Sequence, residues 1–283
     1  MLGTGQGCRG WFSMGGRVAP SCGGKRRVQV ETSSGRPVEA AFASNRLLAT
    51  LGPDARALIL PHLELIELQA GESVLTAGVL VDRTIFPFDT LIISMLVEFS
   101  GGRSVEVASI GKEGAVGGIV SCGAAPAFTH AEVQIAGPAL VMPMHALELA
   151  KRSSAKIQNL FCRYSDYLLA QVMQSVACNS FHPVEARAAR WLMTAQDRVG
   201  GERIALTQEM LAALLGVQRT TVNAIARVMQ DQGMIAYRRG AIVVRDRAAL
   251  AKAACECYRA VEDHFAHVLG DDGRSFASGP GCG

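Results

Sequence analysis

The hydrophobic and polar positions of the chain change their period along its length. Between residues 62 and 144, short segments alternate apolar and polar side chains and are separated by turns that contain glycine or proline. These segments are HLELIELQAGESVL, TLIISMLVEF, RSVEVASI and AEVQIAGPALVMPM. Alternation with a period of two is typical of half-buried strands, and many short strands favour a small antiparallel roll or barrel. Residues 40–63 have a helical pattern that is interrupted at Gly52-Pro53.

From about His145 to Asn179 the pattern becomes that of a helix without internal glycine or proline. Its apolar positions recur at spacings of three and four, at Ile157, Leu160, Phe161, Tyr164, Leu168, Val172 and Val176. At about 1.5 Å per residue this stripe is more than about 25 Å long, so it needs a partner along its whole length. That partner is either the chain's own β-rich domain or the same helix of a second subunit. We expect the second, with these seven residues at a dimer interface.

A hinge is expected in NSFHPVEARAARWL, where Pro183 suits the start of a new helix. Beyond it, Thr207 is a candidate cap for a helix that Gly216 ends, and Gln218 is a candidate cap for the next one. In that next helix the positions with core spacing are Val222, Ile225, Ala226 and Met229. Two short helices joined by a turn that contains glycine are typical of a helix-turn-helix, whose second helix enters the major groove of DNA.

The polar face of this second helix carries side chains that can recognise bases. Arg219 can donate two hydrogen bonds to guanine, Asn223 can pair with adenine, and Thr220 can contact a thymine methyl group. The segment MIAYRRGAIVVRD then predicts a hairpin wing with two arginines at its tip. We expect phosphate contacts from Thr207, Gln218, Thr221, Arg227, Arg238 and Arg239.

Charge is distributed unevenly over the chain, which has a net charge of +3. Residues 41–150 hold 5 Lys and Arg against 11 Asp and Glu, whereas residues 203–247 hold 7 Arg against 3 acidic residues. A basic segment at the helix-turn-helix is the electrostatic signature expected for contact with a phosphate backbone. Double-stranded DNA is therefore the predicted partner.

Other classes of protein find little support in the sequence. The longest apolar run, around residues 91–97, is far shorter than a membrane span, so we expect no membrane contact. The cysteines show no regular framework spacing, which fits a reducing cytoplasm, so we expect a cytoplasmic protein. No G-x-S-x-G, H-E-x-x-H, Walker loop or paired-carboxylate motif is present, so we expect no enzyme. The eight cysteines form no C-x-x-C pair. Cys255 and Cys257, two apart on an expected helix, would point to different sides, so we expect no metal and no cofactor.

Residues 45–262 resemble the Crp-Fnr family of bacterial transcription regulators, most specifically in LTQEMLAALLGVQRTTVNAIARVMQDQGMI. The resemblance implies an α+β fold with a cyclic-nucleotide-binding-like β-roll, a long dimerisation helix and a C-terminal winged helix-turn-helix. It also implies a homodimer on a pseudo-palindromic site, RNA polymerase as a further partner, and Arg219 as a base-contacting residue. The domains expected are a disordered basic leader (1–40), the sensor roll (41–150), the dimerisation helix (151–181), the winged helix-turn-helix (182–262) and a helix end with a flexible tail (263–283).

The sequence departs from this family in two places. Ala224 stands where a second arginine is common, so the usual half-site is not expected. Cyclic-nucleotide binders of this fold use a Gly-Glu pair and an Arg-Ser or Arg-Thr pair, but residues 110–137 have Gly117-Gly118 and Thr129-His130, with Lys112 as their only Lys or Arg. A buried phosphate without a matched charge costs on the order of several kcal/mol, so a degenerate sensor is expected. The alternative function is a ligand-sensing module that acts through protein partners.

Overall fold

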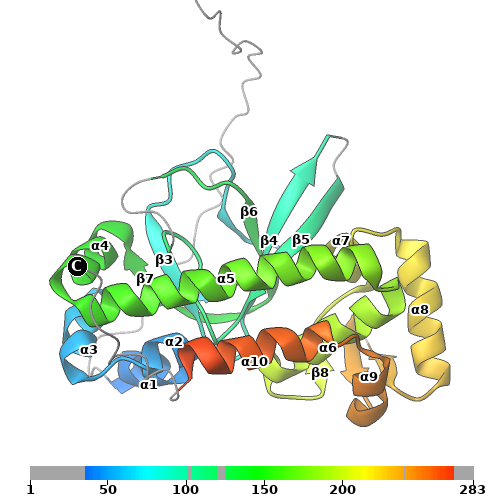
Figure 1. Ribbon diagram of the computed structural model, residues 1–283. Coiled ribbons are helices and arrows are strands. Elements are labelled where there is room, and N and C mark those ends of the chain that lie inside the picture. Colours follow the sequence, from blue (N-terminus) through cyan, green and yellow to red (C-terminus); the bar gives the residue numbers. More distant parts are fainter. Residues whose placement is uncertain (1–35, 101–102, 120–124, 239, 271–283) are drawn as a thin grey trace, which may run out of the picture.

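The computed structural model describes residues 36–100, 103–119, 125–238 and 240–270 (Figure 1). Most of the predicted leader and the predicted tail, residues 1–35 and 271–283, lie outside the described residues. The first helix already begins within the segment predicted as leader. The N-terminal helices are α1 (Arg36–Ser44), α2 (Arg46–Ala49), α3 (Pro53–Ile59) and the short 3-10 turn η1 (Leu60–His62).

Seven strands follow and form a roll of two antiparallel sheets. They are β1 (Glu64–Leu68), β2 (Ser73–Leu75), β3 (Arg83–Pro87), β4 (Ile92–Phe99), β5 (Arg103–Ile110), β6 (His130–Ile135) and β7 (Gly137–Pro143). One sheet has the order β1-β7-β3 and the other the order β2-β6-β4-β5. The roll and most of its strands were predicted from the alternation. Strand β3 was not, because its burial pattern is nearly continuous rather than alternating.

The predicted long helix is two helices, α4 (Met144–Ser153) and α5 (Ala155–Phe181). Ser154 lies between them with an extended backbone, and its side chain accepts a hydrogen bond from the Ile157 amide at 3.4 Å. Serine at this position therefore ends one helix and caps the next. In the described part of the chain, no helix combines the length and the apolarity needed to cross a membrane.

The stripe on α5 packs mainly within its own protomer. Ile157, Leu160, Phe161 and Tyr164 are at most 2% exposed and share a core with the N-terminal helices and the roll. The Tyr164 hydroxyl donates to the carbonyl oxygen of Ala115 and accepts from its amide. Burial against the chain's own roll removes these four residues from any interface, which differs from the sequence prediction. Leu168 and Val172 are half-buried, and Val176 is 62% exposed.

The C-terminal domain begins after the hinge at Pro183. Its elements are α6 (Val184–Val199), β8 (Arg203–Ile204), α7 (Gln208–Leu215), α8 (Arg219–Asp231), β9 (Ile235–Arg238), β10 (Ala241–Val244) and α9 (Arg247–Ala253). The small sheet has the order β8-β10-β9. Its residues join those of α6, α7 and α8 in one apolar core.

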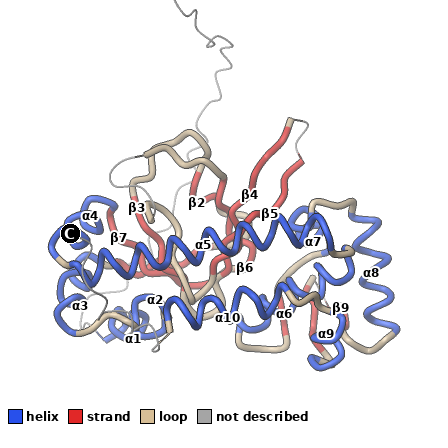
Figure 2. The backbone as a smooth tube through the Cα atoms, in the orientation of Figure 1, coloured by secondary structure: helices blue, strands red, loops and turns tan. Residues whose placement is uncertain are grey.

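The last helix, α10 (Cys257–Leu269), runs back along α5 in the opposite direction (Figures 1 and 2). Tyr167 and Phe265 meet edge to face with ring centroids 5.1 Å apart, and Arg163 donates to the Val268 carbonyl oxygen at 3.2 Å. The predicted boundary at residue 262 falls inside this helix, whose end was expected in the segment after the boundary.

Candidate nucleic-acid interface

Helices α7 and α8 meet at a tight corner that local sequence explains. The Thr207 side chain accepts a hydrogen bond from the Met210 amide at 3.2 Å, which confirms its predicted capping role. Gly216 ends α7 at a φ of 66°, a left-handed conformation that glycine adopts without strain. Gln218 occupies the N-cap position of α8, but its side chain makes no capping hydrogen bond, contrary to the expectation. Gln218 is exposed instead.

Helix α8 has one buried face and one exposed face. Val222, Ile225, Ala226 and Met229 are at most 5% exposed, as their spacing predicted. The residues expected to contact DNA from this corner are all exposed, namely Thr207, Gln218, Arg219, Thr220, Thr221, Asn223 and Arg227. The helix lies at the end of the molecule opposite α3 and α4 (Figure 1). Its first turn is therefore accessible to a large partner.

The predicted wing is the hairpin of β9 and β10. Arg238 pairs with Ala241 in the last register position before the tip, and the Arg238 side chain is exposed. Gly240 has a φ of 72°, which permits the tight reversal. Arg239, the other predicted phosphate contact of the wing, lies outside the described residues.

The arginines of this surface are not neutralised within the described part of the chain. The ion pairs formed there by C-terminal-domain arginines involve Arg198 and Arg247, and neither of these is on α8 or the wing. Arg219, Arg227 and Arg238 thus keep their charges available to an anionic partner. Uncompensated guanidinium groups at a helix N-terminus attract phosphate strongly.

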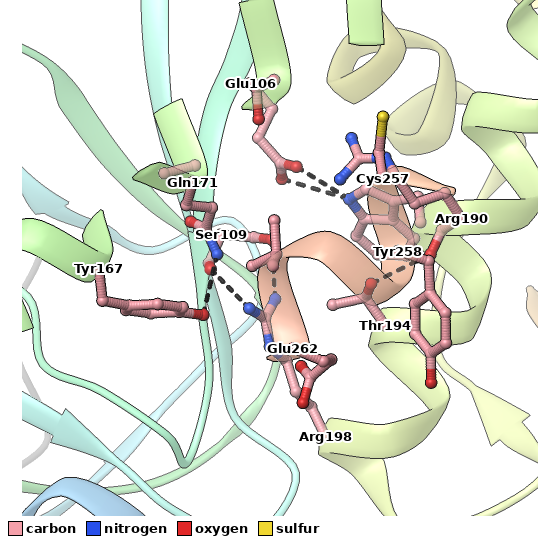
Figure 3. A pocket seen from close by; sticks show the side chains of 14 residues that line it. Glu106, Ser109, Tyr167, Gln171, Arg190, Thr194, Arg198, Cys257, Tyr258 and Glu262 are labelled. Atoms are coloured by element: carbon pink, nitrogen blue, oxygen red, sulfur yellow. Dashed lines mark hydrogen bonds between the residues drawn. The ribbon is translucent and has the colours of Figure 1, made fainter. Parts of the chain in front are cut away.

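The C-terminal domain packs on strand β5 of the roll along a polar cleft (Figure 3). There the Trp191 indole N–H donates to the Glu106 carboxylate at 3.1 and 3.3 Å, and the Ser94 hydroxyl donates to the same carboxylate. Burial raises the pKa of Glu106 above its ordinary value. The turn after α7 also touches this strand, since a Cβ added at Gly216 would meet the Val105 side chain at 3.2 Å.

A second contact between the domains joins α6 to the loop after β5. The Arg198 guanidinium donates a hydrogen bond to the Glu113 carboxylate at 2.6 Å. It also donates to the hydroxyl and to the carbonyl oxygen of Ser109, each at 2.7 Å. Both charged side chains are at least nine-tenths buried. Sequence analysis missed this pair because its members are 85 residues apart and no local pattern links them.

The roll residues compared with cyclic-nucleotide binders are buried or contact other parts of the protein. Thr129 is 7% exposed, and His130 on β6 lies 3.5 Å from the Glu98 carboxylate. The Lys112 carbonyl oxygen accepts a hydrogen bond from the Arg46 amide. Gly118 is closed in by the Met144 side chain.

Several solved structures share the fold of this chain. FixK2 from Bradyrhizobium japonicum matches with a TM-score of 0.59 at 17% identity, over 68% of this chain and 98% of that one. A putative Crp/Fnr regulator from Eubacterium rectale has a TM-score of 0.56 at 16% identity, over 73% and 96%. CLP from Xanthomonas campestris, described as c-di-GMP responsive, has a TM-score of 0.56 at 14% identity, over 69% and 100%.

The sequence itself decides the assignment of the C-terminal domain. Residues 186–253 match the model of the Crp-like helix-turn-helix domain. Residues 186–253 form a Crp-like helix-turn-helix domain. The matched segment runs from α6 through α9 and contains the corner and the wing described above. No curated protein matches the chain at a significant level.

Proposed function

We propose that the protein is a sequence-specific transcription regulator that binds DNA as a homodimer, with α8 of each subunit in a major groove. The observation that carries the proposal is the N-terminal part of α8, where Arg219, Thr220 and Asn223 are exposed beside one another over a buried apolar face. Base edges in the major groove offer the donors and acceptors that these side chains match.

Phosphate contacts would flank the base contacts on both sides. Thr207 begins α7, Thr221 and Arg227 lie on α8, and Arg238 lies on the wing, all of them exposed. Such contacts fix the position of the protein on the duplex and carry no sequence information. They also make the affinity depend on salt, which separates this proposal from the alternative of a sensing module that acts through protein partners.

The dimer would use the face of α5 that its own protomer leaves uncovered. This exposed face consists of Cys162, Asp166, Leu169, Met173, Val176 and Ser180. The spacing alternates between four and three residues, the heptad pattern of paired helices. Leu169, Met173 and Val176 are 54%, 57% and 62% exposed, and a second copy of α5 across a two-fold axis would cover them. A two-fold dimer implies a pseudo-palindromic site with half-sites about one helical turn apart.

The roll is proposed to be a sensor that does not take cyclic AMP or cyclic GMP. Lys112 is the only Lys or Arg in residues 110–137, and Glu113 is already paired with Arg198. Thr129-His130 stands in place of the Arg-Ser or Arg-Thr pair, so a cyclic phosphate would lack the arginine that holds it in the binders of this fold. RNA polymerase is the partner proposed for promoter-bound protein.

The proposal is tested by selection of bound fragments from genomic DNA at physiological salt, without added ligand. Wild-type protein should enrich a two-fold symmetric motif. Arg219→Ala should lose about 1 to 3 kcal/mol of binding free energy and relax base choice at one position of each half-site. Arg259→Ala, which removes an exposed arginine on α10, is the matched control and should leave the motif unchanged. An unchanged motif with Arg219→Ala would refute the assignment of α8.

A further inference from the structure

Four side chains with metal-binding atoms converge where the hinge meets the start of α10. They are Cys178 near the end of α5, His182 at its C-cap, and Cys255 and Cys257 in and after the turn between α9 and α10. All four ligand atoms lie within 4.8 Å of one another. Three sulfurs and one imidazole nitrogen form the donor set of many structural zinc sites.

The sequence-based objection to this site does not hold in the folded chain. It assumed that Cys255 and Cys257 lie on one helix, with side chains that diverge. In the structure Cys255 precedes the helix, and only Cys257 belongs to α10. The turn brings both sulfurs to the same side, where they meet Cys178 from α5.

The distances fit a single four-coordinate ion. The sulfurs of Cys178 and Cys255 are 3.5 Å apart, and the Cys257 sulfur is 3.4 Å from His182 Nδ1. Zn–S bonds of about 2.3 Å and Zn–N bonds of about 2.0 Å in a tetrahedron place ligand atoms about 3.8 Å (S to S) and about 3.5 Å (S to N) apart. Small movements of these side chains would close the site around zinc.

The surroundings of the four residues match those of a metal site as well. His182 turns its other ring nitrogen, Nε2, to the Glu256 carboxylate at 3.2 Å, the arrangement in which a carboxylate orients a metal-bound histidine. The Gln174 amide donates to the Cys257 sulfur at 3.0 Å. The charges of Arg187 and Arg190 act on the cysteine cluster, and the Nε atom of each is buried without a hydrogen-bond partner. These cations would offset the negative charge of three thiolates.

We infer that Cys178, His182, Cys255 and Cys257 bind one zinc ion, which ties the end of α5 and the hinge to the segment that leads into α10. The two cysteines of that segment lie just beyond the matched helix-turn-helix domain, which ends at residue 253. The ion would therefore hold the position of the DNA-binding domain relative to α5. On binding, the three thiols release their protons to solvent and no electron is transferred.

The first test is the metal content of the full-length protein after incubation with zinc and removal of unbound ion. Wild-type protein should retain about one zinc per chain, and its cobalt-substituted form should show the intense visible absorption of a tetrahedral cobalt–thiolate centre. Cys178→Ser and Cys257→Ser should lose both signals. Cys162→Ser, at an exposed cysteine of α5, is the matched control and should keep both.

Two further variants separate ligation from packing. His182→Ala should weaken zinc binding, whereas His182→Cys should restore it, because cysteine replaces the ligand but not the ring. Glu256→Gln should lower the affinity by about 10-fold or more. The inference is overturned if the wild-type protein holds no zinc, or holds iron instead. It is also overturned if thiol titration of the unfolded, unreduced protein finds two fewer thiols than the eight cysteines of the chain, which would indicate a disulfide. Cobalt and thiol measurements on the wild-type protein do not depend on whether the variants fold.

Discussion

The pair of Arg198 and Glu113 offers the sharpest test of how the two domains are held together. Arg198→Met keeps an unbranched apolar stem under Gly111 but removes the guanidinium group, which makes three hydrogen bonds of 2.6 to 2.7 Å. The Glu113 carboxylate would then stay buried with the Gly111 amide, at 3.0 Å, as its remaining hydrogen-bond donor in the described residues. Removal of one partner from a buried ion pair costs about 3 to 5 kcal/mol, because the other charge is left uncompensated.

The cost is measured by urea unfolding followed through the fluorescence of Trp191, which lies in the contact between the domains. The matched control is Arg247→Met, which removes a pair with Asp197 of similar length, 2.6 Å, but with side chains 44% and 36% exposed. An exposed pair contributes about 0 to 1 kcal/mol, so the control should change stability little. The double variant Glu113→Gln with Arg198→Met should lose less unfolding free energy than the two single variants lose together, since neither charge remains unpaired. A cost below about 1 kcal/mol for Arg198→Met, or one equal to that of the control, would refute the reasoning.

Three further outcomes are expected. Met173→Glu should convert the dimer to monomers in sedimentation analysis, because it places a charge in the exposed face of α5. Leu149→Glu, at an exposed position on α4, is the control and should leave the dimer intact. An unchanged mass of the Met173→Glu variant would exclude this face as the dimer interface. Because burial raises the pKa of Glu106, the folded state disfavours its charged form, so wild-type stability relative to Glu106→Gln should fall as pH rises above the ordinary value of 4.5 and level off above the raised pKa. The measurement is the thermal unfolding of wild type and of Glu106→Gln at several pH values. A difference in stability between the two proteins that does not vary with pH would contradict this prediction. Arg238→Ala should weaken binding to all DNA sequences alike and reduce the slope of log K against log salt by about 0.9, and a change of preferred sequence would argue against a phosphate contact.

The sequence determined the elements whose hydrophobic period repeats locally. Alternation predicted most strands of the roll, and the spacing of Val222, Ile225 and Met229 predicted the buried face of α8. Thr207 and Gly216 predicted the start and the end of α7 because capping depends on the local backbone. These features rest on interactions within a few residues, so a single sequence carries them.

Only the tertiary structure decided which surfaces meet. The stripe on α5 had two possible partners, and the packing of Phe161 and Tyr164 against the roll left a different face of the helix exposed. The ion pair of Arg198 with Glu113 and the convergence of Cys178 with Cys255 join residues 85 and 77 positions apart. Contacts of this kind depend on how complete elements pack, and no periodicity along the chain records them.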